Sequence, residues 1–181
     1  MKEKRIIQAA TLLALAFTVS SASANWTTKR TKDPMGGPAS IDVCTISTNS
    51  VAQDFPYNRG RTTARLCVSK SGHEYETYLT LNQGQLMCQA GSETFMLRAD
   101  DKQAKTMYCS PTVSGTNEQA YFTDGNDSVR EVVSAKKIVR IKVNLYAHGA
   151  VVFEFKPLGR ALPKEFSDLI PSEVGGLPTD R

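Results

Sequence analysis

The sequence predicts an α+β fold that is mainly antiparallel β, a β-sandwich-like arrangement or curved sheet with one packed helix and two disulfides. Three observations predict it. Apolar and polar residues alternate in many short segments, one segment has helical spacing instead, and four cysteines stand at positions 44, 67, 88 and 109. Successive side chains of a strand point to opposite faces of a sheet, so this alternation is typical of strands with one buried face.

The N-terminal residues have the features of a secretory signal peptide. Three of the first five residues are basic, an apolar stretch covers residues 6–19, and small residues at 21–24 precede Asn25. The apolar stretch is short for a membrane span. We therefore expect cleavage before Asn25 and a periplasmic or secreted protein; the alternative is an uncleaved anchor.

This leader sets the expected domain organisation: a signal peptide over 1–24, a single disulfide-stapled β-rich domain over 25–156, and a C-terminal tail with a short helix over 157–181. Removing the leader takes three of the 22 basic and one of the 18 acidic residues, leaving 19 and 17. A surface this balanced does not favour nucleic acid. No second apolar run is long enough to cross a membrane, so the expected partner is a protein or an envelope component.

The four cysteines predict disulfides rather than a metal site or a catalytic thiol. All four lie in the exported part, and an even number of cysteines in an oxidising compartment is ordinarily a disulfide set. Metal sites favour close cysteine pairs or histidines at helical spacing, whereas the shortest gap here is 21 residues and the two histidines, His73 and His148, fall in predicted turns.

Strand alternation favours one of the three possible disulfide connectivities. Around Cys44 the apolar residues occupy odd positions, and around Cys67 they occupy even positions, so each cysteine projects from the more polar face of its strand. If the two strands are neighbours, their sulfurs can meet. We therefore favour Cys44–Cys67, together with Cys88–Cys109.

The expected strands cover residues 40–48, 62–70, 74–81, 93–99, 105–109, 120–123, 138–146 and 150–156, with a bulge or bend at 82–85; residues 26–32 are expected to be short and extended at best. The last two strands form the clearest hairpin. A three-residue loop over 147–149 sets Val143 opposite Phe153 and Lys142 opposite Glu154, whereas a two-residue loop would mix core and solvent positions. Gly149 would then take the left-handed conformation that such loops need.

One segment, about 127–137, predicts a helix. Asp127 is a suitable N-cap, and the basic pair at 136–137 suits the negative end of a helix. Val129, Val132 and Val133 form an apolar stripe at helical spacing. We interpret this stripe as core packing.

Motifs for chemistry are absent from the sequence. It contains no G-x-S-x-G, P-loop or dinucleotide fingerprint, and the two histidines are poor candidates for a base. The acidic pair Asp100-Asp101 fits a hairpin turn. The "DGND" segment at 124–127 fits a turn and helix cap better than a calcium loop, because it lacks the alternating ligands and the closing Glu. We predict no catalytic residue, no metal site and no cofactor.

Several sequence blocks stand in an order that resembles small exported bacterial proteins: "W…KDPMGG", "ISTNSV…FPYNRG", "GQLMC", "AKKIVRIKV" and "FEF". Some of these proteins are similar to periplasmic accessory proteins of type VI secretion. The resemblance spans about residues 26–155 and implies a periplasmic, non-enzymatic β-rich domain. That group has a further cysteine soon after the one in "GQLMC", which this chain lacks.

The resulting hypothesis is a periplasmic, non-catalytic binding or accessory protein that acts through a surface of its disulfide-pinned sheet. One alternative is an inhibitor or immunity protein of a cell-wall enzyme, for which a protruding rigid loop would be the sign. The candidate binding loop is 49–61, with Phe55, Pro56 and Tyr57. The other alternative is an envelope hydrolase, for which a groove with a carboxylate pair beside His73 or His148 would be the sign.

Overall fold

The computed structural model describes residues 26–88, 94–112, 117–159 and 162–169. The expected signal peptide at 1–24 and the end of the expected tail, from 170 on, lie outside the described residues. Within the described part, no helix is long and apolar enough to cross a membrane.

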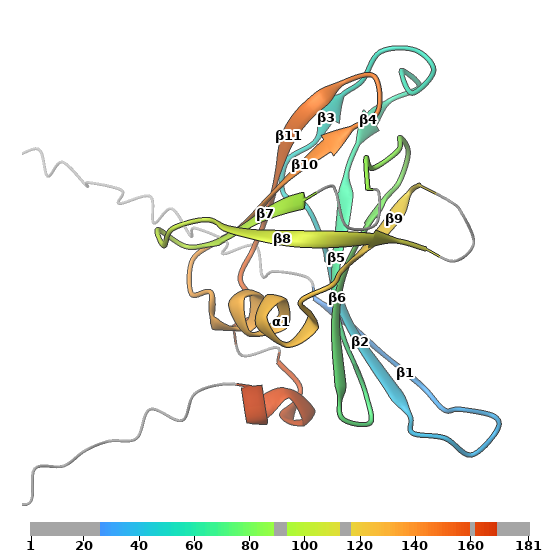
Figure 1. The fold of residues 1–181 in the computed structure, drawn as a ribbon, viewed down its shortest axis with the longest axis vertical. Helices are drawn as coiled ribbons and strands as arrows, with labels where there is room; N and C mark the ends of the chain where they lie inside the picture. The colour runs from blue at the N-terminus through green and yellow to red at the C-terminus, as the bar shows by residue number, and fades with distance from the viewer. Residues whose placement is uncertain (1–25, 89–93, 113–116, 160–161, 170–181) are drawn as a thin grey trace, which may run out of the picture.

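Nine antiparallel strands form one sheet in the order β1-β2-β5-β6-β9-β8-β7-β10-β11 (Figure 1). The strands are β1 (Thr27–Thr31), β2 (Ser40–Ile46), β5 (Ala64–Ser71), β6 (Glu74–Leu81), β7 (Thr94–Ala99), β8 (Lys105–Pro111), β9 (Gln119–Phe122), β10 (Val139–Leu145) and β11 (Gly149–Phe155). A separate short pair consists of β3 (Val51–Ala52) and β4 (Arg61–Thr62). The predicted fold class, mainly antiparallel β with one helix and two disulfides, is confirmed.

Strand β8 joins the two halves of this curved sheet. Its first residues pair with β7 and its last residues with β9, and Figure 1 shows β8 running across the direction of β5 and β6. Apolar side chains of both halves therefore meet in one core. Fully buried members are Leu66, Val68 and Leu79 from one half and Phe95, Leu97, Ile141 and Phe153 from the other.

Both predicted disulfides are present, Cys44–Cys67 and Cys88–Cys109. Cys44 and Cys67 are register partners on β2 and β5, with their Cα atoms 4.1 Å apart. The alternation argument holds because Val43 and Leu66 fill the core face, which leaves the sulfurs on the opposite face. This bridge pins two neighbouring strands together.

The helix α1 (Gly125–Ser134) starts and ends earlier than the predicted 127–137. Its N-cap is Asp124, so the prediction of Asp127 as N-cap is wrong; Asp127 lies in the first turn. A glycine is needed at 125, because a Cβ there would collide with the Tyr75 carbonyl oxygen of β6. The helix packs against β6 and β7 with Val129 and Val132 buried, as the valine stripe predicted.

The helix ends before the basic pair because Asp100 takes over the next backbone donors. Its carboxylate accepts hydrogen bonds from the N–H groups of residues 136, 137 and 138 at 2.9, 2.6 and 3.0 Å. Ala135 already has extended backbone. The chain is thus turned out of the helix and into β10.

The hairpin of β10 and β11 has the predicted faces but a different register. Residues 139, 141, 143 and 145 are buried together with Val151, Phe153 and Phe155. However, Val143 lies opposite Val151, not Phe153, and Glu154 lies opposite Arg140, not Lys142. The loop has three residues, as predicted, but they are 146–148, with Ala147 at φ 56° and Gly149 at φ 85°.

The predicted register is wrong because a slip of two residues preserves both faces and still sets a cation opposite Glu154. The segment that follows β2 fixes the strand β11 instead. Thr48 N–H donates to the Glu154 carbonyl at 2.7 Å, while the Asn49 side chain donates to the Val152 carbonyl and accepts from the Glu154 N–H, at 2.8 and 2.9 Å. These contacts come from about 100 residues away in the chain.

The short helix expected near the C-terminus is the 3-10 helix η2 (Lys164–Leu169). Phe166 is fully buried, and its ring lies 5.9 Å from the ring of Tyr75 on β6. Lys70 Nζ donates to the Glu165 carbonyl at 2.6 Å, and the Tyr75 hydroxyl donates to the Asp168 carboxylate. This segment therefore packs onto the sheet.

Candidate functional site

The predicted binding loop, 49–61, projects from one end of the molecule, where Figure 1 shows it beyond the tips of β10 and β11. Phe55 is 82% exposed. Pro56 is also exposed, the bond between these two residues is a cis peptide, and Tyr57 is partly buried. The structure thus brings the three predicted residues together at the tip, with the phenyl ring of Phe55 in solvent.

Hydrogen bonds from the loop's own base brace it. The β3–β4 pair closes the loop, and the buried Gln53 amide donates to the Thr62 hydroxyl between the two strands. The Arg61 guanidinium donates to both the hydroxyl and the carbonyl of Ser50. The base of the loop is therefore held from both sides.

The tip has its own supports. Tyr57 N–H donates to the Asp54 carbonyl at 2.9 Å, and the Gln83 side chain donates to the Tyr57 carbonyl at 3.1 Å. The turn around Phe55 is thus bound to the segment after β6. In this loop, an exposed aromatic side chain stands on a supported backbone.

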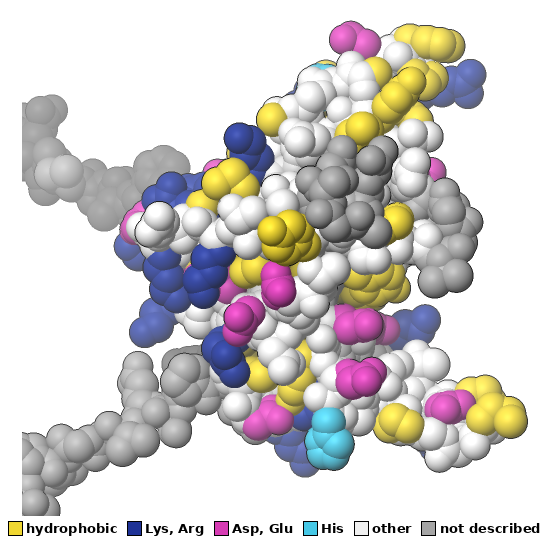
Figure 2. Space-filling model, in the orientation of Figure 1, with side chains coloured by type: hydrophobic (Ala, Val, Ile, Leu, Met, Phe, Trp, Pro, Cys, Tyr) yellow, Lys and Arg dark blue, Asp and Glu magenta, His cyan; other side chains and the backbone are white. Residues whose placement is uncertain are grey.

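The loop also carries exposed charges. Asp54 directly precedes Phe55 in the chain and Arg59 follows it by four residues, and both are exposed. In Figure 2, hydrophobic and basic side chains stand together at this end of the molecule. Such a tip can offer an apolar anchor and a guanidinium to a partner at the same time.

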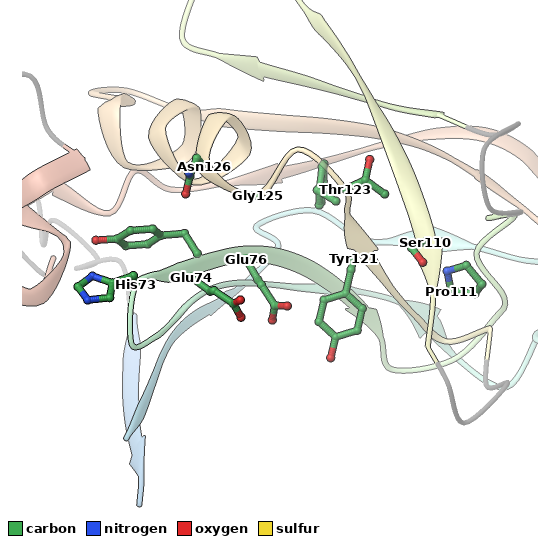
Figure 3. A pocket seen from close by; sticks show the side chains of 11 residues that line it. His73, Glu74, Glu76, Ser110, Pro111, Tyr121, Thr123, Gly125 and Asn126 are labelled. Atoms are coloured by element: carbon green, nitrogen blue, oxygen red, sulfur yellow. The ribbon is translucent and has the colours of Figure 1, made fainter. Parts of the chain in front are cut away.

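The groove that a hydrolase would need, with a carboxylate pair beside a histidine, is present in part. A hollow of about 630 Å³ is bordered by His73, Glu74 and Glu76, by Ser110 and by the start of α1 (Figure 3). Glu74 and Glu76 point to the same side of β6, but His73, in the β5–β6 turn, points away from them, and Ser110 lies at the other end of the hollow. All three of His73, Glu74 and Glu76 are exposed to solvent.

The remaining chemistry candidates of the sequence are His148, Asp100 and the "DGND" segment. His148 is exposed in the β10–β11 loop. Burial alone would raise the pKa of the Asp100 carboxyl. The hydrogen bonds that this carboxylate accepts from three backbone N–H groups instead hold its pKa below the ordinary value. In the "DGND" segment, Asp127 forms an ion pair with Arg130 at 3.2 Å. Among the described residues, no group of three or more His, Cys, Asp or Glu side chains is placed to hold a metal ion.

The sequence indicated a polar face around Cys44 and Cys67, but not that β6 and β9 extend this face, on the side of the sheet away from α1. Tyr78 of β6 and Tyr121 of β9 are register partners there, with ring centroids 5.4 Å apart. The alternation that placed Cys44 and Cys67 on this face also places Asp42 and Arg65 on it. The sequence could not place the two tyrosines next to each other on this face, because β6 and β9 are separated by two other strands in the chain.

Comparisons with protein-family models, with curated proteins and with solved structures found no match to this chain. Its two disulfides are typical of proteins that fold outside the reducing cytoplasm.

Proposed function

We propose that this protein is a periplasmic, non-catalytic binding or accessory protein that docks onto a partner protein through the loop 49–61. The observation that carries the proposal is Phe55, 82% exposed at the tip of a loop braced at its base and its tip. The signal-peptide features, together with the two disulfides, support a periplasmic location.

A single exposed apolar side chain is common on protein surfaces and by itself does not indicate a binding site. The bracing of the backbone distinguishes Phe55. Binding energy at interfaces is concentrated in a few aromatic and arginine side chains, and a loop that is already ordered loses little entropy on docking. Phe55 and Arg59 provide such a pair on a supported backbone, which favours insertion of the ring into an apolar pocket with acidic residues at its rim.

A second candidate is an inhibitor or immunity protein of a cell-wall enzyme, since a projecting loop with an aromatic tip can fill an enzyme cleft. The resemblance to accessory proteins of type VI secretion fits either partner. The hydrolase alternative rests on Glu74, Glu76 and His73. It predicts degradation of purified cell wall by this protein, with loss of the activity in Glu76→Gln.

Site-specific crosslinking in cells tests the proposal. Phe55 is replaced by the photoreactive p-benzoylphenylalanine, and Met35, 91% exposed in the β1–β2 turn at the other end of the molecule, is replaced in a control. The expected result is a discrete protein adduct from position 55 and none from position 35. Adducts of equal pattern from both positions, or none from position 55, would contradict docking through the loop.

A further inference from the structure

The polar face of the sheet carries a second hollow, which the loop 49–61 does not border. It measures about 320 Å³ and is lined by side chains of β1, β2, β5, β6 and β9. The Cys44–Cys67 disulfide is buried in its floor, and the Cys44 sulfur lies 4.0 Å from the Tyr78 hydroxyl. Five strands thus contribute to one rigid, disulfide-pinned surface.

Tyr78 lines this hollow, and its register partner Tyr121 lies beside it, where it borders the hollow of about 630 Å³. The paired rings of Tyr78 and Tyr121 provide an aromatic surface. Burial, and next the negative charge of Asp42, raise the pKa of Tyr78 to about 12, so its hydroxyl is a neutral hydrogen-bond donor near pH 7. The Gln119 amide donates to the Tyr121 hydroxyl at 3.0 Å, which leaves the Tyr121 proton directed to other acceptors.

The charges differ along this face of the sheet: Arg65 lines the hollow, whereas Glu76 lies beyond its other end and borders the hollow of about 630 Å³. The strand registers place Asp42, Ser69 and Glu76 side by side in one row across β2, β5 and β6. On the same face, the next row contains Cys67 and Tyr78, and the row after it places Arg65 beside Thr80. Along β6, from Glu76 to Thr80, this separation is about 13 Å. The face therefore has carboxylates at one end, tyrosines in the middle and a guanidinium at the other end.

Both charged ends are accessible. Glu76 and Arg65 are exposed, and among the described residues neither belongs to an ion pair. Lys29 lies opposite Asp42 in the register and offsets part of that charge, so Glu76 is the main anion at its end. The surface also continues past both ends, into the hollow of about 630 Å³ bordered by Glu76 and into one of about 380 Å³ that shares Arg65 and Thr80.

We propose that this face binds a short extended peptide with free ends, its ammonium group against Glu76 and its carboxylate against Arg65. A chain of about four residues spans the separation between the two groups. Opposite charges at the two ends match a zwitterionic peptide better than a neutral glycan, and the Tyr121 hydroxyl, whose proton Gln119 does not use, offers a partner to a peptide group between the ends. This site goes beyond the proposed function, since it uses none of the residues of the loop.

Titration of the purified protein with tetra-alanine, followed by NMR chemical shifts and calorimetry, tests this inference. We expect saturable shifts at Tyr78 and Tyr121, and affinity weakened about tenfold or more by Arg65→Ala and by Glu76→Gln. Both residues are exposed, so both variants should fold, which circular dichroism checks. Lys142→Ala, an exposed cation on β10, is the matched control and should bind as the wild type does.

A second part of the experiment uses peptides whose ends are blocked. Tetra-alanine amidated at its C-terminus should bind weakly, and Arg65→Ala should weaken it no further. Equal binding of free and blocked peptides, or no saturable shift up to about 10 mM peptide, would overturn the inference. Binding of an N-acetylglucosamine tetramer at the same tyrosines, in place of the peptide, would also overturn it and would assign the face to a glycan.

Discussion

Arg140 of β10 and Glu154 of β11 lie directly opposite each other, and the Arg140 guanidinium donates to the Glu154 carboxylate at 2.9 Å. The same carboxylate-bearing residue is held through its backbone by Thr48 and Asn49. Glu154 is therefore held both by the partner strand and by a distant segment. Because both side chains are about one third exposed, the ion pair itself contributes little stability.

The hairpin faces predict unequal costs for two substitutions. Phe153 is fully buried, so Phe153→Ala should destabilise the protein by about 3–5 kcal/mol. Lys142 is exposed on the other face, and Lys142→Ala should cost less than about 1 kcal/mol. Urea denaturation of both variants measures the difference. Similar costs would mean that the assignment of faces is wrong.

The disulfide Cys44–Cys67 closes a loop with a sequence separation of 23 residues. Replacing both cysteines by serine should lower the free energy of unfolding by about 3 kcal/mol, mainly through the greater freedom of the unfolded chain. Chemical denaturation measures this loss. Peptide mapping without reductant should recover Cys44–Cys67 and Cys88–Cys109; a Cys67–Cys88 peptide would contradict the fold.

Asp100 predicts a loss of stability in acid. Its lowered pKa means that the charged form is stabilised by folding, so this contribution is present above the unfolded pKa of about 3.9 and is lost as the pH falls through the folded value. Asp100→Asn keeps a residue that tolerates the φ of 53° but has one acceptor oxygen instead of two. It should cost roughly 1–3 kcal/mol at pH 7 and reduce the acid dependence of unfolding. An unchanged pH profile would contradict this role.

Tyr78 predicts the opposite direction of pH dependence. Its folded pKa of about 12 lies above the unfolded value of about 10, so its contribution is complete below pH 10 and is lost as the pH rises from about 10 to 12. Burial also raises the pKa values of Tyr75 and Tyr121, so ultraviolet titration should show several late phenols, and Tyr78→Phe should remove the amplitude of one phenol near pH 12. Asp42→Asn should bring that late transition to lower pH, because it removes a nearby negative charge. An unchanged amplitude of the late transition in Tyr78→Phe would exclude Tyr78 as one of its sources.

Local alternation was sufficient to predict most strands of the large sheet, both disulfides and the buried faces of the hairpin, but β3 fell within the predicted loop 49–61. Alternation could not fix the register, because registers that differ by two residues bury the same side chains. Asn49, which holds β11 in place through its hydrogen bonds, lies about 100 residues away in the chain and therefore outside any local pattern. The end of α1 escaped prediction for the same reason, since the acceptor that ends it is Asp100, 36 residues earlier.

The two surfaces differ in how far the sequence could indicate them. The loop 49–61 could be named from its turn residues and aromatics, but the exposure of Phe55 depends on bracing by Gln83 from a later segment. The tyrosine hollow required the pairing of β6 with β9, which is non-local. Sequence patterns identify the face that a residue occupies, whereas the neighbours across that face come from the sheet order.

The central claim is tested most directly with the partner protein that is captured by crosslinking at position 55. This partner is purified, and its affinity is measured for three forms of this chain: wild type, Phe55→Ala and Met35→Ala. Loss of a buried aromatic anchor should weaken binding by about thirtyfold or more, or about 2 kcal/mol. Met35→Ala should bind as the wild type does, because it removes an equally exposed side chain at the other end of the molecule. Equal affinities of wild type and Phe55→Ala would contradict docking through the loop.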